Sequence, residues 1–356
     1  MEEKSLRFLE DLIDAPSPSG FEAQIQEVVR KRMGAFTEDV ETDVHGNVIG
    51  RLNRGAPFRV MLAGHCDEIG FLVQYVSDEG FLYVQPVGGV DLALMPGRRV
   101  YVHTKKERIL GVVGKKPIHL MTPEERKKVP KAHELWVDIG VRDKKDAKKR
   151  VQTGDMVTVA EGLAMLGKDI AVSRAFDDKI GAFIVTEVLG RLSKRKGFKN
   201  VEVAAVSTVQ EEIGLRGART SAFGIEPHVG VAVDVGFASD QPGAEKKIVG
   251  DIKLGGGPIL HKGPNINPVV GQLLVDVADR KKIPYQMKAE SRATGTDANV
   301  IQITRAGVAA GLVGVPNRYM HTPVEMISLK DVKNSIRLLV EFVGALKPGM
   351  DFTPRA

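Results

Sequence analysis

The spacing of apolar residues changes twice along this sequence, and the changes divide it into three segments. From about residue 70 to residue 162, apolar residues recur at every second position, as in FLVQYVSDEGFLYVQPV and RRVYVHTKKERILGVVG, and turn residues separate the runs. A period of two is typical of strands that bury one face. Several such short strands in succession predict a small antiparallel barrel or sandwich.

The segments on either side of this stretch alternate between helical and strand-like patterns. Residues 5–34 predict two helices, of which the second follows SPSGFE, whose Ser and Pro suit a helix start, and stops at Gly34. FRVMLAGH at 58–65 is a short apolar run of the buried-strand kind. Further helices and strands are predicted at 180–195, 201–209, 229–236, 268–282 and over the closing segments AGVAAGLVGVP and LKDVKNSIRLLVEFVGALK.

Strands that are apolar throughout belong to sheets with both faces covered. We therefore predict an α/β fold with a mixed, largely parallel sheet flanked by helices and with an inserted, β-barrel-like domain. The α/β domain is discontinuous and comprises residues 1–67 and 163–356, whereas the insertion spans residues 68–162.

Composition narrows the class of protein. The chain has 43% hydrophobic and 27% charged residues, as ordinary soluble globular proteins do, and it has no apolar run of bilayer-spanning length. The N-terminus MEEKSLRFLEDLIDA is charged and has no signal-peptide core. The single cysteine, Cys66, precludes an internal disulfide. Both observations favour the cytoplasm.

The net charge is +6, with basic clusters at 144–150 and 194–199. Aromatic residues make up only 5% of the chain, and no stacking motif or recognition helix interleaves the basic residues. We therefore interpret these clusters as a solvated, lysine-rich surface and expect neither a nucleic-acid nor a membrane partner.

Metal-binding side chains recur at the ends of the predicted α/β strands. They are His65 and Asp67 in GHCDEIG, Asp177 and Asp178 in RAFDDKIG, Glu211 and Glu212 in QEEIG, Asp234 in VAVDVG and His321 in NRYMHTPVEM. Open α/β sheets gather ligands at the carboxyl ends of their strands, so we expect these residues to converge. The histidines without such company are predicted to be ordinary hydrogen-bonded residues: His45, His103, His119, His133, His228 and His261.

The chemistry of the converging set favours a pair of transition-metal ions. Asp234 would be a costly buried charge without a cation. Two histidines with several carboxylates suit zinc or cobalt better than calcium or magnesium. The number of acids favours two metals that share one bridging carboxylate. Cys66 lies between two residues that face the metal, so its side chain is predicted to face away as a buried small hydrophobe.

The chain resembles the tetrahedral aminopeptidases over nearly its whole length. The resemblance rests on the motifs PSPSGFE, GHCDEIGF, AFDDKIG, QEEIGLRGA, VAVDVG, LGGGP, GPNINP, RATGTDAN and YMHTPVEM, in this order. Members of this family are cytosolic dinuclear metallopeptidases, and some were named glutamyl aminopeptidase or cellulase M. The resemblance implies an aminopeptidase that hydrolyses N-terminal residues from short peptides with two divalent metal ions per subunit.

The same resemblance implies a role for each site residue. The implied metal ligands are His65, Asp177, Glu212, Asp234 and His321, with one histidine on each metal and Asp177 as the bridging carboxylate. Glu211 resembles the general base, and Asp67 resembles the acid that supports His65 from behind. Asp178 matches no ligand. In its implied role, Glu211 accepts a proton from the attacking water and returns it to the leaving amine.

The insertion resembles the β-barrel dimerisation domain of the same family. The resemblance implies homodimers that assemble into a hollow tetrahedral dodecamer with inward-facing active sites. Such a chamber would admit only short, unfolded peptides.

Other functions compete with this interpretation. A dinuclear deacylase or carboxypeptidase shares the same metal scaffold. An endoglucanase requires an acid and a base or nucleophile that flank a sugar, rather than histidines gathered around metals. A non-enzymatic binding protein with a structural zinc would leave Glu211 without a role.

Overall fold

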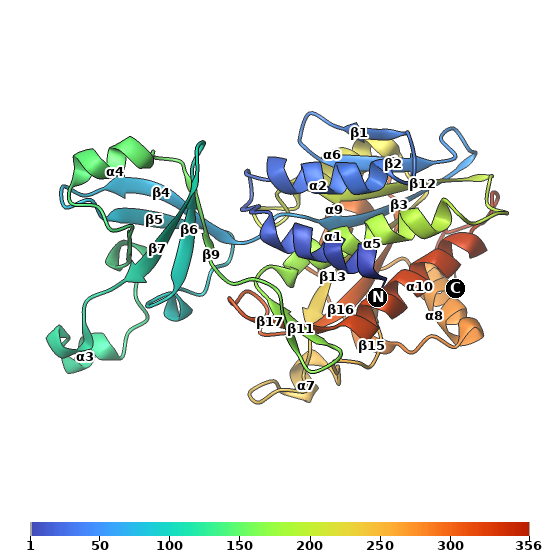
Figure 1. The fold of residues 1–356 in the computed structure, drawn as a ribbon. Coiled ribbons are helices and arrows are strands. Elements are labelled where there is room, and N and C mark those ends of the chain that lie inside the picture. The colour runs from blue at the N-terminus through green and yellow to red at the C-terminus, as the bar shows by residue number, and fades with distance from the viewer. Residues whose placement is uncertain (1, 356) are drawn as a thin grey trace.

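The structure of the protein is a computed structural model that describes residues 2–355. It consists of a large sheet covered by helices and a smaller barrel that stands away from the sheet (Figure 1). The chain leaves the sheet after β3 (Phe58–His65) and returns to it in β10 (Ala164–Leu166) and β11 (Ile170–Ser173). The predicted α/β fold with an inserted β-barrel is therefore confirmed, and the domain boundaries at 67/68 and 162/163 stay a prediction.

The centre of the large sheet is parallel. β12 (Val201–Thr208), β3, β13 (Val229–Phe237) and β16 (Ala309–Arg318) lie side by side in this order. The outer strands are β1 (Val40–Thr42) and β2 (Val48–Leu52) beyond β12, β17 (Glu325–Ser328), β11 and β10 beyond β16, and β14 (Ile259–Lys262) with β15 (Gln286–Ala289) beside β16. The carboxyl ends of the four parallel strands thus meet at one edge.

The central strands are buried on both faces, as their apolar sequences predict. In β3, Val60 and Leu62 pack against one layer of helices, whereas Met61 and Ala63 pack against the other. The first layer contains α1 (Glu3–Asp14), α2 (Ala23–Gly34), α5 (Phe176–Leu192), α8 (Pro268–Lys281) and α10 (Leu329–Ala345), and the second contains α6 (Arg216–Ile225) and α9 (Ala298–Gln302).

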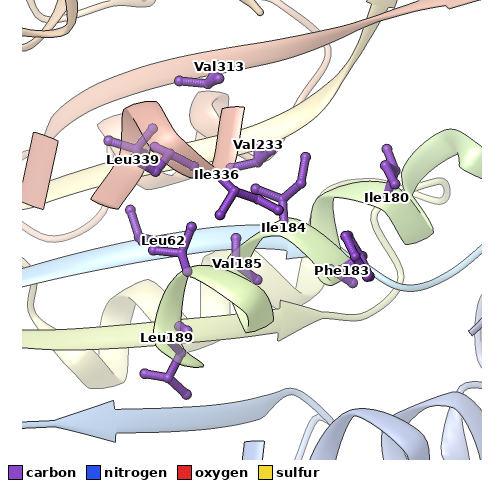
Figure 2. Packing of buried hydrophobic residues seen from close by; sticks show 14 of the residues in the cluster. Leu62, Ile180, Phe183, Ile184, Val185, Leu189, Val233, Val313, Ile336 and Leu339 are labelled. Carbon is purple, nitrogen blue, oxygen red and sulfur yellow. The ribbon is translucent and has the colours of Figure 1, made fainter. Parts of the chain in front are cut away.

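Helix α5 occupies the middle of the first layer. It is buried around nearly its whole circumference, which requires apolar residues on all of its sides. Figure 2 shows this packing through Ile180, Phe183, Ile184, Val185 and Leu189 of α5, Leu62, Val233 and Val313 of the sheet, and Ile336 and Leu339 of α10. The packing fixes the first turn of α5 beside the end of β3.

The inserted segment forms a closed barrel with its own core. Its strands, in order around the barrel, are β4 (Gly70–Val76), β5 (Leu82–Val87), β8 (Trp136–Asp138), β7 (Arg108–Gly114), β6 (Arg99–His103) and β9 (Met156–Val159). Alternate residues such as Val100 and Val102 of β6 point into this core. The insertion also contains the short helices α3 (Pro123–Arg126) and α4 (Lys144–Arg150), and single 3-10 turns at Leu92–Leu94, Ile118–Leu120 and Ala132–Glu134. A further short helix, α7 (Lys246–Val249), lies outside the insertion.

One local prediction is wrong. Helix α2 does follow SPSGFE, but the serines of that segment do not start it, and its N-cap residue Glu22 makes no side-chain capping bond. Instead, the Ser17 hydroxyl donates to the carbonyl of Cys66 over 2.7 Å, and the Ser19 hydroxyl donates to Asp67 Oδ2 over 2.6 Å. A tertiary contact has replaced the local cap, and it supports the segment that follows β3.

Two expectations from composition can be compared with the structure. Cys66 is a free and fully buried cysteine, which confirms its interpretation as a small buried hydrophobe. Within the part of the chain that the structure describes, no helix is both long enough and apolar enough to cross a lipid bilayer.

Candidate metal centre

The predicted site residues converge at the carboxyl edge of the parallel strands. His65 ends β3, Asp234 lies near the end of β13, and the others follow strands or begin α5. Together they line a cleft of about 370 Å³: His65, Asp177, Glu211, Glu212, Asp234 and His321. Asp67 is fully buried behind this cleft. A larger cavity of about 720 Å³ lies between α1 and the barrel. None of the predicted site residues lines it, so we do not consider it the candidate site.

Close packing of α5 on β3 brings Asp177 to His65. Next to His65, Gly64 has no side chain, and a Cβ atom there would lie 2.3 Å from the backbone carbon of Gly181 in α5. Only glycine permits this approach. Asp177 and Asp178 form the first turn of α5, where the backbone departs from helical geometry and the peptide bond between them is cis. The strand end and the helix start therefore present polar side chains to the same point.

The carboxylate of Asp177 lies between two imidazole rings. Its Oδ1 is 3.3 Å from His65 Nε2, and its Oδ2 is 3.2 Å from His321 Nε2. Each oxygen thus faces a different histidine. This is the arrangement that a bridging carboxylate between two cations requires.

Each of the two histidines is held through its other ring nitrogen. His65 Nδ1 lies 3.1 Å from the carbonyl oxygen of Asp67, and His321 Nδ1 lies 3.1 Å from the carbonyl oxygen of Gly89. A carbonyl accepts, so both Nδ1 atoms carry the hydrogen and donate it. Both Nε2 atoms are then free to face the cleft as ligands.

Asp67 holds the two neighbouring glutamates by their backbone. The amide of Glu211 donates to Asp67 Oδ1 over 3.0 Å, and the amide of Glu212 donates to Asp67 Oδ2 over 3.2 Å. Asp67 Oδ1 is also 3.4 Å from His65 Nδ1. One buried carboxylate therefore sets the position of three site residues, which is more than its predicted support of His65.

The two glutamate side chains reach different histidines. Glu211 Oε2 is 3.7 Å from His65 Nε2, whereas Glu212 Oε1 is 3.4 Å from His321 Nε2. Despite this proximity, Glu212 Oε1 is buried and has no hydrogen-bond partner. A buried carboxylate oxygen without a donor is costly, and a bound cation would remove that cost.

Two groups of side chains have the spacing of metal ligands. One is His65, Asp177 and Glu212, and the other is His65, Asp178 and Asp234, with donor atoms within 4.8 Å of one another in each. Asp178 also accepts two backbone hydrogen bonds, from the His65 amide over 3.2 Å and from the Gly181 amide over 3.1 Å. Both carboxylate oxygens of Asp178 thus accept backbone hydrogen bonds, one from β3 and one from α5.

The carboxylates of the site carry more negative charge than the protein compensates. Burial raises the pKa of Glu211 to about 10, and burial together with the nearby charge of Asp177 raises the pKa of Glu212 to about 8. The same two causes raise the pKa of Asp234 well above its usual range. Burial acts in this direction on Asp177 as well, but hydrogen bonds from both histidines outweigh it and lower the pKa.

Protonated histidines balance part of this charge. A hydrogen bond to Asp177 raises the pKa of His321 to about 9. Burial acts to lower the pKa of His65, but the charge of Glu211 and the hydrogen bond with Asp177 outweigh it and raise the pKa. The protons on His65 and His321 thus supply positive charge that bound cations could supply instead. A set of imidazole nitrogens and carboxylate oxygens fits divalent zinc or cobalt.

Sequence reasoning missed two supports of His321. Glu325 is fully buried at the start of β17, and it accepts hydrogen bonds from the amides of Asp177 over 2.8 Å and His321 over 3.1 Å. Its place in the YMHTPVEM motif, four residues after His321, is a signal that could have been used. The second support is the backbone carbonyl of Gly89 in the insertion. A backbone carbonyl can come from any residue type, so the sequence does not indicate this contact.

The prediction that His261 is an ordinary hydrogen-bonded histidine is wrong. His261 lies on β14, lines the cleft and is only 6% exposed. Its Nδ1 is 3.5 Å from Glu290 Oε1. No hydrogen bond of good geometry reaches either ring nitrogen, so the ring meets Glu290 only through this long polar contact.

Comparison with models of protein families identifies one match. The model of the M42 glutamyl aminopeptidases matches residues 46–338. Among curated proteins, the lysyl aminopeptidase of Pyrococcus furiosus is 37% identical over 350 residues, covering 97% of this chain and 98% of the relative.

Solved structures agree with this family. The TET aminopeptidase of a marine-sediment Thaumarchaeota archaeon is 33% identical, covers 97% of both chains and superposes with a TM-score of 0.93. The TET1 peptidase of Pyrococcus horikoshii, described as assembling into a tetrahedron or a large octahedral shell, is 29% identical with a TM-score of 0.86 over 96% of this chain and 100% of that one.

Proposed function

The chain belongs to the M42 glutamyl aminopeptidase family and is a peptide hydrolase, and from this premise we propose that it removes N-terminal residues from short peptides with two divalent metal ions and a glutamate general base. The observation that carries the proposal is the Asp177 carboxylate, whose two oxygens face the Nε2 atoms of two histidines that are each held through Nδ1.

The proposed ligands are His65, Asp177, Glu212, Asp234 and His321, with Asp177 shared by both ions. Zinc or cobalt suits this mixture of imidazole and carboxylate donors. When bound, such ions supply Lewis-acid activation of a water molecule and of the scissile carbonyl group.

Glu211 is the proposed general base. It lines the cleft, and its Oε2 lies 3.7 Å from His65 Nε2, whereas Glu212 faces His321. Without metal, burial raises the pKa of Glu211, and bound cations would lower it again so that the carboxylate can accept a proton. Glu211 Oε therefore takes the proton of the attacking water and passes it to the leaving amine. The Asp67 carboxylate keeps the base in place through the Glu211 amide.

The proposal is tested with matched peptides. The metal-loaded protein should release the first residue of an unblocked tetrapeptide and should leave the N-acetylated peptide intact. Release of the last residue instead would favour a carboxypeptidase, and removal of the acetyl group would favour a deacylase. A chelator should abolish the activity, and zinc or cobalt should restore it. Activity that survives complete metal removal would contradict the proposal.

We further propose that the barrel joins subunits into dimers and that six dimers form a dodecamer. Support comes from the Pyrococcus horikoshii relative, described as forming a tetrahedron, and from apolar side chains on the outside of the insertion. They include Leu110, Ile118, Leu120 and Val129, each more than half exposed. Burial of such residues between copies stabilises an assembly. Light scattering should then give a mass far above that of one chain.

A cytoplasmic location belongs to the same proposal. It is supported by the free, buried Cys66, because a chain without disulfides has no need of an oxidising compartment.

A further inference from the structure

Beyond the proposed ligands and base, the described lining of the cleft has one pair of opposite charges. Lys288 lies on β15 and Glu290 follows the end of that strand. Lys288 Nζ is 2.7 Å from Glu290 Oε1, and the side chains are only 15% and 22% exposed. The two charges therefore compensate each other on the wall of the cleft rather than face solvent.

The groups around Lys288 and Glu290 stabilise this ion pair. The nearby His261 ring and the Lys288 ammonium hold the pKa of Glu290 down at about 2, so this carboxylate is ionised at neutral pH. Burial lowers the pKa of His261, so the ring adds no positive charge there at neutral pH. Lys288 Nζ also lies 5.8 Å from the centre of the Phe237 ring, a distance at which a cation and an aromatic face attract each other.

The rest of this wall is apolar or already hydrogen-bonded. Leu215, Leu312 and Met320 line the cleft, and the hydroxyl of Thr294 contacts that of Thr296 over 2.8 Å. The wall thus offers apolar area and a charge pair without net charge. A single unpaired charge, which would attract a substrate of opposite sign, is absent from the described lining beyond the metal centre.

We propose that this peptidase prefers N-terminal residues with uncharged side chains, because Lys288 and Glu290 neutralise each other on the wall of the cleft and leave neither charge free for a substrate. The inference rests on the proposed aminopeptidase function. A cationic side chain would have to compete with Lys288 for Glu290, and an anionic one would have to compete with Glu290 for Lys288. Either would lose water without gaining an unpaired partner, which is unfavourable. Specificity then arises from rejection of both charge types.

The test measures kcat and KM for leucyl, lysyl and glutamyl nitroanilides with the metal-loaded protein. The wild type should favour the leucyl substrate over both others by about tenfold or more. Lys288→Met should leave Glu290 unpaired and raise the lysyl-to-leucyl ratio of kcat/KM by about 10- to 100-fold, mainly through KM. Glu290→Gln should raise the glutamyl-to-leucyl ratio in the same way.

The double variant is the matched control. Lys288→Met combined with Glu290→Gln has no charge on the wall, so both ratios should return to about the wild-type values. Ratios within one enzyme are insensitive to a general loss of folded or metal-loaded protein. A wild-type preference for lysyl or glutamyl substrate would overturn this inference alone. So would a Lys288→Met variant whose lysyl-to-leucyl ratio does not rise, or a Glu290→Gln variant whose glutamyl-to-leucyl ratio does not rise. Absence of hydrolysis of all three substrates would overturn the proposed function as well.

Discussion

His65 and His321 both face the Asp177 carboxylate, but different parts of the fold position them. We call the surroundings of each histidine one half of the site. His65 ends a central strand, is 2% exposed, and donates to the carbonyl of a residue only two positions away. His321 lies in a loop with a left-handed backbone conformation, is 35% exposed, and donates to the carbonyl of Gly89, which is 232 residues away in the insertion. The first half is built locally by the sheet. The second half depends on where the barrel sits.

This difference has a consequence for the role of the barrel. A backbone carbonyl of the insertion holds one of the two proposed metal-binding rings, so the barrel helps to position the candidate site. The His65 half should tolerate changes in the insertion, whereas the His321 half should not. The following predictions test this contrast.

The largest effect is expected from Glu211, which lies beside His65. Glu211→Gln preserves the size of the side chain and the backbone bond to Asp67 but removes the base. Turnover should fall by about 10²- to 10⁴-fold, while metal content stays near the wild-type value. Kinetics beside metal analysis of the same sample checks this. A variant that lost a metal would mean that Glu211 is a ligand and that the roles of Glu211 and Glu212 are exchanged.

Asp67→Asn probes the locally built half. The substitution removes the charge that lies 3.4 Å from His65 Nδ1 and weakens the hold on both glutamate amides. Metal affinity should fall by about 10- to 100-fold, as is typical when a residue behind a ligand is changed. Competition titration against a chelator measures the affinity. A variant that titrates like wild type would contradict the assigned role of Asp67.

Gly89→Ala probes the half that depends on the barrel. A Cβ atom at this position would lie 2.9 Å from His321 Nδ1, so the ring would have to shift. The affinity of one of the two metal ions should fall by about 10- to 100-fold, whereas that of the other should stay near wild type. Isothermal titration resolves the two binding steps.

The matched control for this change is Gly162→Ala, in the same insertion. A Cβ atom there would meet no neighbouring atom within 4 Å, so both binding steps should be unchanged. If Gly89→Ala weakened both steps equally, or neither, the contrast between the two halves would be wrong.

A smaller, graded effect is expected from pH. His321 and Glu212 have pKa values raised to about 9 and about 8, so both hold protons at pH 7 in the absence of metal. A metal needs the deprotonated ligands, so binding must release these protons. The proposed ligands His65 and Asp234 also have raised pKa values. Affinity should therefore rise with pH to at least about 9, by about tenfold per unit for each displaced proton, and it should fall as pH drops. Titrations in buffers with different ionisation enthalpies count the protons, and zero release at pH 7 would contradict this electrostatic account.

The sequence predicts those parts of the site that depend on local pattern. His65 and Asp234 were identified because each interrupts or ends an apolar strand, and strand ends of a parallel sheet meet at one edge. The period of two over the insertion likewise predicted the barrel strands, because alternate burial is visible residue by residue.

The parts that could not be predicted depend on contacts between distant segments. The Gly89 carbonyl has no side-chain signature, so nothing in the sequence links it to His321. Serine favours local caps, so SPSGFE predicts a helix start, but burial of Ser17 and Ser19 against the segment after β3 outweighs that preference. The sequence does not link His261 to the site, because its charged neighbour Glu290 comes from a distant segment of the chain.

The central claim is that Asp177 joins two metal ions in one centre. X-ray absorption spectroscopy of the zinc-loaded protein tests it most directly, because the spectrum reports ligand type and metal–metal distance together. We predict nitrogen and oxygen ligands only, with Cys66 buried away from the site, and a zinc–zinc contribution at about 3.5–4 Å. A spectrum with no zinc–zinc contribution at full metal loading, or one with sulfur in the coordination shell, would contradict the account.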